Sequence, residues 1–135
     1  MIMRPYSGSF ETGMIGAVQR GREGEAAGRQ YLLDAGWSIV AQNFRTRRGE
    51  VDIVALRGEV VAFVEVKRVN RYTQEDLQHV ISAKKRRSII ETSKLFLAMH
   101  RKYNQYRIRY DVMLVQGNAC VRHMEGAFAE HDEAE

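Results

Sequence analysis

The segment Gly49–Lys67, with the sequence GEVDIVALRGEVVAFVEVK, constrains the fold more than any other part of the chain. It contains two runs rich in Val, Ile and Phe, at Val51–Leu56 and Val60–Val66, and such runs are typical of β-strands. Gly58-Glu59 between them suits a two-residue hairpin loop of type II′, which takes Gly at its first central position. The segment is therefore predicted to form a β-hairpin.

The length of this loop determines which residues of the two strands face each other. The expected pairs, from the loop outward, are Leu56 with Val61, Val54 with Phe63, Asp52 with Glu65, and Glu50 with Lys67. Opposed residues have Cβ atoms roughly 4.5–5.5 Å apart, and like charges there are destabilising. Asp52 and Glu65 are thus forced together in an otherwise apolar hairpin. A bound divalent cation is the most economical explanation.

A second interpretation of these charges is a solvated strand end with an ion pair between Glu50 and Lys67. The other side of the hairpin is apolar throughout and is expected to be buried, through Val51, Ile53, Ala55, Ala62, Val64 and Val66. Both sides are apolar near the loop, which predicts a central sheet covered on both faces. Asp, Glu and Lys together in such hydrophobic strands favour a polar site that opens at one edge of this sheet.

The length of 135 residues suits one domain with its own core. The lone Cys120 cannot form an internal disulfide, which points to a reducing compartment. There is no CxxC motif, no apolar run near the ~18 residues of a membrane helix, and no signal peptide. We expect a cytoplasmic protein without a membrane segment. Its expected parts are a flexible lead-in at 1–16, a single domain at 17–128 and an acidic tail at 129–135.

The net charge of +4 conceals an uneven distribution. The last eleven residues hold five acidic residues and no Lys or Arg, so residues 1–124 carry all 21 basic residues against 12 of the 17 acidic ones. A body this basic suits nucleic acid, although a soluble surface that happens to be basic explains the charge equally well. The cations expected to contact phosphate are Arg45, Arg47, Arg48, Arg68, Lys84, Lys85, Arg86 and Arg87.

The remaining elements follow from periodicity and capping signals. Apolar residues three and four apart, ending at Gly36, predict a first helix. Thr73 with Asp76 resembles a capping box, and Ser82 suits the N-cap of a longer helix. Outside the hairpin we expect helices at 17–35, 73–81 and 82–100, and strands at 37–45, 106–115 and 119–124.

One face of the first predicted helix carries very small residues. Gly21, Gly24 and Gly28 recur at steps of three and four, so this face can approach a sheet or a phosphate backbone closely. Glu25 lies on the same face, and its spacing leaves it either an exposed glutamate or a site residue. Asp111 also admits two interpretations, as a support for the carboxylate site or, more in keeping with its neighbours, as a member of a structural ion pair.

The order of helix, three strands, helices and two strands, with Asp52 before Glu65-Val66-Lys67, resembles the PD-(D/E)xK core of restriction endonucleases and archaeal Holliday-junction resolvases. The motifs themselves are similar to those of the small bacterial YraN family over about residues 21–128. They are Gly21-x-x-Gly24-Glu25, Gly49-Glu50-Val51-Asp52, Phe63-Val64-Glu65-Val66-Lys67, Lys84 and Arg109-Tyr110-Asp111-Val112. The chain departs from the wider pattern because no Pro precedes Asp52, and because Arg68-Val69 replaces the Thr-Arg that follows the lysine in many relatives.

The resemblance implies an α/β (α+β) fold with a central mixed sheet flanked by helices, in the order α-β-β-β-α-α-β-β. It also implies that Asp52 and Glu65, with Glu25 and the Val66 carbonyl, bind Mg²⁺ or Mn²⁺. Lys67 would hold the attacking water and stabilise charge on the phosphate, with Glu50 and Asp111 as supporting residues. By analogy with the resolvases, a two-fold dimer is implied as well.

The function implied is a metal-dependent endonuclease acting on DNA. No residue pattern reads bases, so selectivity for junction or branched structures is expected over selectivity for sequence. The alternative is a non-catalytic nucleic-acid-binding module on the same fold, which the intact Asp52, Glu65 and Lys67 disfavour. A protein-binding adaptor would leave the acidic pair and the lysine unexplained.

Overall fold

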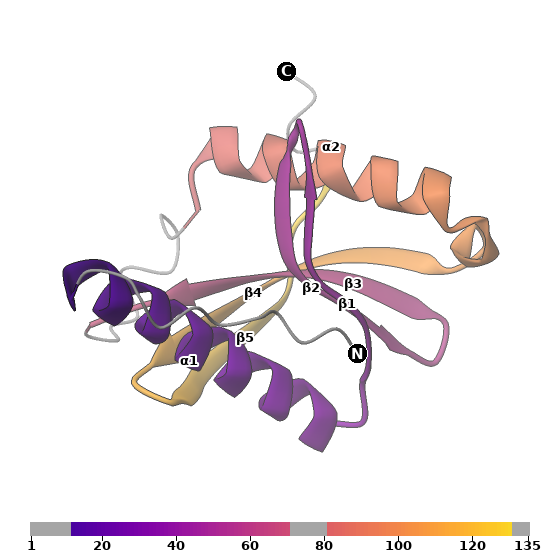
Figure 1. Ribbon diagram of the computed structural model, residues 1–135. Helices are drawn as coiled ribbons and strands as arrows, with labels where there is room; N and C mark the ends of the chain where they lie inside the picture. Colours follow the sequence, from indigo (N-terminus) through magenta and orange to yellow (C-terminus); the bar gives the residue numbers. More distant parts are fainter. Residues whose placement is uncertain (1–11, 71–80, 131–135) are drawn as a thin grey trace.

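The structure is a computed structural model that describes residues 12–70 and 81–130. Two helices cover opposite faces of one five-stranded sheet (Figure 1). The elements are α1 (Thr12–Asp34), β1 (Ser38–Thr46), β2 (Gly49–Arg57), β3 (Val60–Arg68), α2 (Ala83–Met99), the 3₁₀ turn η2 (Arg101–Tyr103), β4 (Arg107–Gln116) and β5 (Ala119–Phe128). This arrangement confirms the predicted fold class and is consistent with a restriction-endonuclease-like core. The helix expected at 73–81 lies almost entirely outside the described residues.

The strands follow the order β1-β2-β3-β4-β5 across the sheet. Neighbours are antiparallel except β3 and β4, which are parallel. Parallel neighbours cannot be joined by a tight turn, so the chain crosses from β3 to β4 by way of α2. The sheet is therefore mixed, as expected, and α2 lies over one of its faces (Figure 1).

The hairpin of β2 and β3 has the predicted register. Its paired residues are Arg57 with Val60, Leu56 with Val61, Ala55 with Ala62, Val54 with Phe63, and Ile53 with Val64. Gly58 has a φ of +59°. Among the described residues, Asn43 is the one non-glycine residue with a positive φ, so the φ of Glu59 is not positive. A positive φ at Gly58 followed by an ordinary φ at Glu59 is the pattern of a type II′ turn, as predicted.

Each face of the sheet carries its own hydrophobic core. The core on the α2 side includes Val54, Val61, Phe63, Ile89, Phe96, Tyr110 and Val112. The core on the α1 side includes Leu32, Trp37, Ile53, Ala55, Ala62, Val64 and Met113. A sheet buried on both faces was the sequence-based expectation, and two cores confirm it.

Val51 corrects one detail of that expectation. It was predicted to lie on the side of Ile53, but it belongs to the core on the α2 side. The pairing of β1 with β2 shifts between Ile39 and Ala41, and such a bulge bends and twists a strand pair. The far ends of β1 and β2 accordingly rise out of the sheet towards α2 (Figure 1), which carries Val51 to that helix.

The element ends agree with most of the local signals. Ser82 caps α2 as predicted, because its Oγ accepts a hydrogen bond from the Lys85 N–H at 3.1 Å. The first helix begins at Thr12 and not at residue 17, and it stops before Gly36, whose φ is +91°. β5 continues past residue 124 because a register shift near Gly126 lets the strand resume. Among the described residues, no helix is long and apolar enough to cross a membrane.

Candidate active site

Asp52 and Glu65 lie where the pairing of β2 with β3 ends. The last paired residues are Ile53 and Val64. Beyond them, Asp52 Oδ2 accepts a hydrogen bond from the Val66 N–H at 2.8 Å. The ladder thus stops one step short of the predicted Asp52–Glu65 pair, and a side-chain contact holds the two strands together in its place.

The two carboxyls share a site that disfavours their charged forms. The Glu65 side chain is only 11% exposed, and its Oε1 atom is buried without a hydrogen-bond partner among the described residues. Burial, followed by the nearby Asp52 carboxylate, raises the pKa of Glu65 to about 8. Burial also raises the pKa of Asp52, against the opposing effect of the Val66 N–H. A bound cation would relieve both the repulsion and the lack of partners.

The cation beside this pair comes from α2. Lys85 Nζ lies 3.6 Å from Glu65 Oε2, and its charge opposes the rise in pKa of both carboxyls. The sequence suggested Lys85 only as a phosphate contact. Its position over Glu65 depends on the crossover that lays the first turn of α2 above β3, and no sequence spacing reveals that.

Lys67 lies at the outer end of β3, two residues after Glu65 and therefore on the same side of the strand. Its side chain is exposed, and no ion pair or hydrogen bond involves it within the described part of the chain. Glu50 pairs with Arg45, its partner across β1 and β2, at 3.2 Å, and not with Lys67. The Lys67 ammonium is thus left available at the edge of the acidic pair.

Glu25 is half-buried on α1. The small-residue face of α1 does approach the sheet closely, as expected: a Cβ at Gly28 would lie 3.3 Å from Val66 Cγ2. Within residues 12–70 and 81–130, no third His, Cys, Asp or Glu joins Asp52 and Glu65 in a group that could hold a metal ion. The described site is therefore a two-carboxylate site.

Asp111 is the centre of a separate network in which every partner comes from β4 or β5. It is fully buried and accepts hydrogen bonds from both Arg109 Nε and Nη2 (2.9 and 2.8 Å), from His123 Nε2 (2.8 Å) and from the Gly126 N–H (2.9 Å). Burial raises the pKa of Asp111, but the bonds from His123 and Arg109 outweigh it and leave the pKa lowered. Of the two interpretations of Asp111, these contacts fit the structural ion pair.

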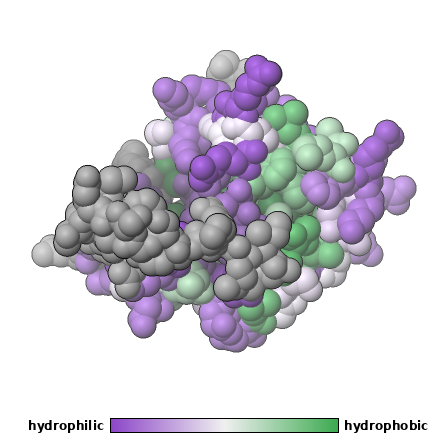
Figure 2. All heavy atoms as spheres, in the orientation of Figure 1, coloured by the Kyte–Doolittle hydropathy of each residue, from purple (hydrophilic) through white to green (hydrophobic). Residues whose placement is uncertain are grey.

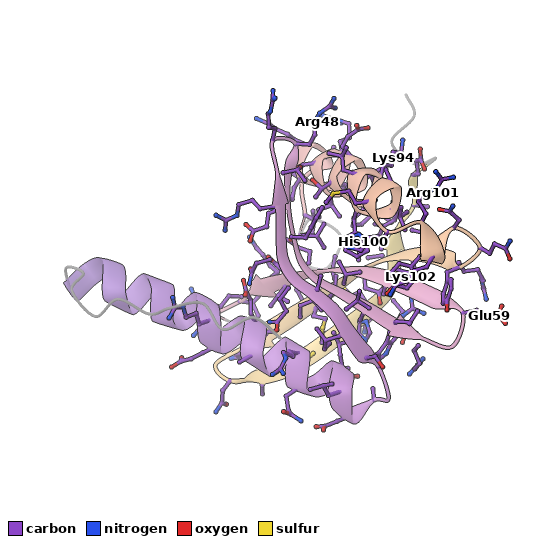
Figure 3. The ribbon with its side chains drawn as sticks, turned by 45° about the vertical axis from the view of Figure 1, so that its right-hand side comes forward. Arg48, Glu59, Lys94, His100, Arg101 and Lys102 are labelled. Atoms are coloured by element: carbon purple, nitrogen blue, oxygen red, sulfur yellow. The ribbon has the colours of Figure 1, made fainter. Side chains whose placement is uncertain are left out.

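The basic residues gather where the tip of the β1–β2 hairpin meets α2. Ser88 Oγ donates a hydrogen bond to the Arg48 carbonyl at 2.7 Å, and a Cβ at Gly49 would overlap that same hydroxyl. Figure 3 shows Arg48 at this end of the hairpin, beside α2. Lys84 is one helical turn before Ser88, and Arg87 is three residues after Lys84, so Lys84 and Arg87 lie on the same side of α2. Hydrophilic residues cover much of the surface over α2 and this hairpin tip (Figure 2).

Several of the predicted phosphate contacts already have protein partners. Arg48 forms an ion pair with Glu91 at 3.1 Å, Arg86 donates to the Ile81 carbonyl at 2.7 Å, and Arg68 donates to the Gly117 carbonyl at 3.4 Å. Among the predicted phosphate contacts, the exposed cations for which the described residues offer no ion pair are Arg47, Lys84 and Arg87. These three are the residues of the basic stripe, and they are best placed to meet a polyanion.

Residues 24–115 match the model of the Uncharacterised protein family UPF0102. The chain belongs to this family. UPF0102 is another name for the YraN family, which the sequence motifs resemble. The matched region includes the acidic pair, Lys67 and Lys85.

Relatives in this family match nearly the whole chain. A UPF0102 protein of Treponema denticola is 37% identical over 123 residues, which cover 82% of this chain and 95% of that protein. UPF0102 proteins of Rhodopseudomonas palustris and Nitrobacter winogradskyi are each 35% identical over 114 residues, or 84% of this chain and 86% and 95% of theirs. Their names state a family and no activity.

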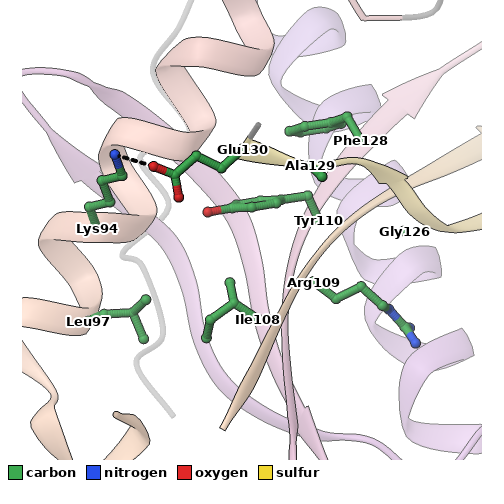
Figure 4. Close-up of a pocket in the computed structure, with 9 residues that line it drawn as sticks. All are labelled: Lys94, Leu97, Ile108, Arg109, Tyr110, Gly126, Phe128, Ala129 and Glu130. Carbon is green, nitrogen blue, oxygen red and sulfur yellow. Dashed lines mark ion pairs between the residues drawn. The ribbon is translucent and has the colours of Figure 1, made fainter. Parts of the chain in front are cut away.

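This UPF0102 protein also has a pocket of about 330 Å³ at the C-terminal half of α2 (Figure 4). An ion pair between Lys94 and Glu130, at 2.7 Å, closes one side of it. The Arg109 guanidinium turns away from the pocket, towards Asp111. None of the predicted catalytic residues lines this pocket, so it is separate from the acidic pair.

Proposed function

We propose that this UPF0102 protein is a metal-dependent endonuclease that hydrolyses phosphodiester bonds in DNA. The observation that carries the proposal is the Glu65 Oε1 atom, which is buried without a hydrogen-bond partner among the described residues, next to the Asp52 carboxyl. Carboxylate oxygens are the ligands that Mg²⁺ and Mn²⁺ prefer, and Mg²⁺ keeps several of its waters, so two carboxylates can suffice. The residues present therefore fit such an ion.

The protein groups around this pair have distinct tasks in the proposed reaction. The Val66 N–H holds the Asp52 carboxylate in place, and the buried position of Glu65 keeps bulk water from its free oxygen. A divalent ion bound there would supply an activated water and neutralise charge on the phosphate. The exposed Lys67 ammonium would stabilise the negative charge that develops on the phosphate oxygens. Glu25 and the Val66 carbonyl remain proposed as further ligands.

The substrate class follows from the surface next to the pair. Arg47, Lys84 and Arg87 present exposed positive charge around the hairpin tip and the first turns of α2. The backbone N–H groups at the start of a helix add to such a site for phosphate. Contacts to phosphates position a nucleic acid without reading its bases, which supports selectivity for branched DNA over selectivity for sequence.

A second candidate function is a nucleic-acid-binding module without turnover. Two observations favour it: the Lys85 ammonium already lies against Glu65, and no third acidic ligand joins the pair in the described part of the chain. A cation supplied by the protein itself could satisfy the carboxylates permanently. The two candidates differ in what the loss of Lys67 does.

The experiment compares Lys67→Ala with wild type for binding and for cleavage. An interaction made chiefly in the transition state affects turnover more than binding, and loss of one such group typically costs on the order of 10²–10³ in rate. With Mn²⁺ and a panel of branched, duplex and single-stranded DNA, the variant should bind within a few-fold of wild type and cleave at least about a hundred-fold more slowly.

Lys102→Ala is the matched control, because it removes one exposed Lys near the other end of α2 (Figure 3). It should cleave like wild type. Equal, weak cleavage by wild type and Lys67→Ala would mark the activity as a contaminant. The binding module would then replace the nuclease.

A further inference from the structure

Lys85 holds a position that its neighbours on α2 do not share. Its ammonium lies 3.6 Å from Glu65 Oε2, whereas Lys84 is exposed and Arg86 donates to the Ile81 carbonyl. The Lys85 side chain is 42% exposed and the Glu65 side chain 11% exposed. One end of this ion pair is therefore buried with the carboxylates, while the other end stays in reach of solvent.

A metal ion and the Lys85 ammonium would compete for the same carboxylate. A divalent cation bound by Asp52 and Glu65 would lie within a few ångströms of Nζ, and at that separation like charges repel strongly in a partly buried site. Lys85 has a flexible four-carbon stem, and its backbone N–H stays bound to Ser82 whatever the side chain does. The side chain can therefore leave Glu65 without disturbing the start of the helix.

We propose that Lys85 is the internal counter-cation of the metal-free acidic pair, that a divalent cation binds by displacing it, and that the displaced ammonium contacts a phosphate of the DNA. This inference rests on the proposed nuclease function. An ammonium that has lost its carboxylate needs a new anion, and a phosphate held by the adjacent basic stripe supplies one. Through Lys85, bound metal thus raises the affinity for DNA, and bound DNA raises the affinity for metal.

This coupling is reciprocal, because two ligands that share one equilibrium change each other's affinity by the same factor. Without Lys85 the metal-free site has no competing cation, so the metal should bind more tightly. DNA should then have little further effect on metal binding. Lys84 has the same charge and lies one residue away, but it does not contact the pair. It is therefore a matched control.

The test measures the Kd for Mn²⁺ by calorimetry. The parent protein carries Lys67→Ala so that DNA is not consumed, and each of two variants adds Lys85→Gln or Lys84→Gln to this parent. Without DNA, Lys85→Gln should bind Mn²⁺ on the order of tenfold more tightly than its parent, and Lys84→Gln should match the parent. A branched DNA should tighten Mn²⁺ binding several-fold in the parent, but not in Lys85→Gln. Melting curves and far-ultraviolet circular dichroism check that α2 is intact.

The outcomes separate this inference from the proposed function. Mn²⁺ binding that is equal or weaker in Lys85→Gln overturns the counter-cation role and leaves the metal site standing. Tighter binding in both lysine variants overturns it too, because a general charge effect then suffices. No Mn²⁺ binding by wild type or by any variant, up to millimolar metal, removes the metal site and the nuclease together.

Discussion

Asp52 on β2 is tied to Val66 on β3 by a hydrogen bond of 2.8 Å from the Val66 N–H to the Asp52 carboxylate, just past the last paired residues of the hairpin. The same side chain thus fastens two strands and faces the buried Glu65. These two tasks respond differently to substitution. An amide keeps an oxygen that can accept from the Val66 N–H, whereas a methyl group does not.

Asp52→Asn should therefore leave the metal-free protein equally stable or more stable, because the hydrogen bond can persist while the repulsion with Glu65 is relieved. Asp52→Ala also relieves the repulsion but loses the bond, which costs about 1 kcal/mol relative to Asn. Both variants should lose the rise in melting temperature that Mn²⁺ produces in wild type, since only the folded state binds the ion. Thermal melts with and without Mn²⁺ check this. An unchanged metal response in Asp52→Asn and in Glu65→Gln would remove the proposed metal site.

Glu65 should make the metal-free protein less stable as the pH rises. Its pKa is raised from about 4.5 in the unfolded chain to about 8 in the folded protein, so the folded state holds its proton more tightly. The stabilisation is complete below about pH 4.5 and is lost as the pH rises to about 8, with a slope of at most about 1.4 kcal/mol per pH unit. The raised pKa of Asp52 acts in the same direction.

Urea unfolding in the presence of a chelator, between pH 5 and pH 8.5, measures this loss. Glu65→Gln should flatten the curve, and the difference between the two proteins cancels the contribution of the histidines. The lowered pKa of Asp111 acts oppositely, because its stabilisation is lost only as the pH falls below about 4. A wild-type curve no steeper than that of Glu65→Gln would contradict the burial of an ionisable Glu65.

The basic stripe should give DNA binding a steep dependence on salt. The logarithm of the binding constant falls with the logarithm of salt concentration by about 0.9 per phosphate neutralised. Lys84→Ala with Arg87→Ala should flatten this slope by up to about two units, because both side chains are exposed on one side of α2. Fluorescence anisotropy at several salt concentrations measures the slope.

Arg101→Ala with Lys102→Ala is the matched control for the stripe, since it removes the same charge beyond the C-terminal end of α2 (Figure 3). That end is about 24 Å from the first turn of the helix, so the slope should stay near that of wild type. Equal flattening by both double variants would mean that net charge, and not the stripe, governs binding.

Gly49 should tolerate no side chain. Its φ is +148°, and a Cβ there would overlap the Ser88 hydroxyl that holds the Arg48 carbonyl. Gly49→Ala should thus cost more than about 2 kcal/mol, because it combines backbone strain with displacement of the hairpin tip from α2. Gly58→Ala is the control: its φ is also positive, at +59°, but nothing lies near its Cβ, so about 1 kcal/mol is expected. Chemical denaturation measures both; equal losses would argue against the tight contact at Ser88.

The parts of the fold that the sequence predicts are those set by local rules. The loop at Gly58 determined the hairpin register, and Ser82 marked the start of α2. The contacts that escaped prediction join residues far apart in the chain, namely Ser88 with Arg48, His123 with Asp111, and Lys85 with Glu65. The contacts of Ser88 and Lys85 depend on how α2 lies over the sheet, and the contact of His123 depends on the bulge of β5. Residue spacing encodes neither the placement of the helix nor the bulge.

The parallel pairing of β3 with β4 also orders the events of folding. Asp52 and Glu65 belong to one hairpin, which needs only a short loop to close, but Lys85 reaches them only when α2 has packed over the sheet. Local contacts form sooner than those that require the closure of long loops. We therefore expect the two carboxyls, Asp52 and Glu65, to come together before the Lys85 ammonium reaches them. In stopped-flow measurements without metal, we expect refolding to slow as the pH approaches 8, and to slow less in Glu65→Gln. Refolding rates that do not depend on pH in either protein would contradict this order.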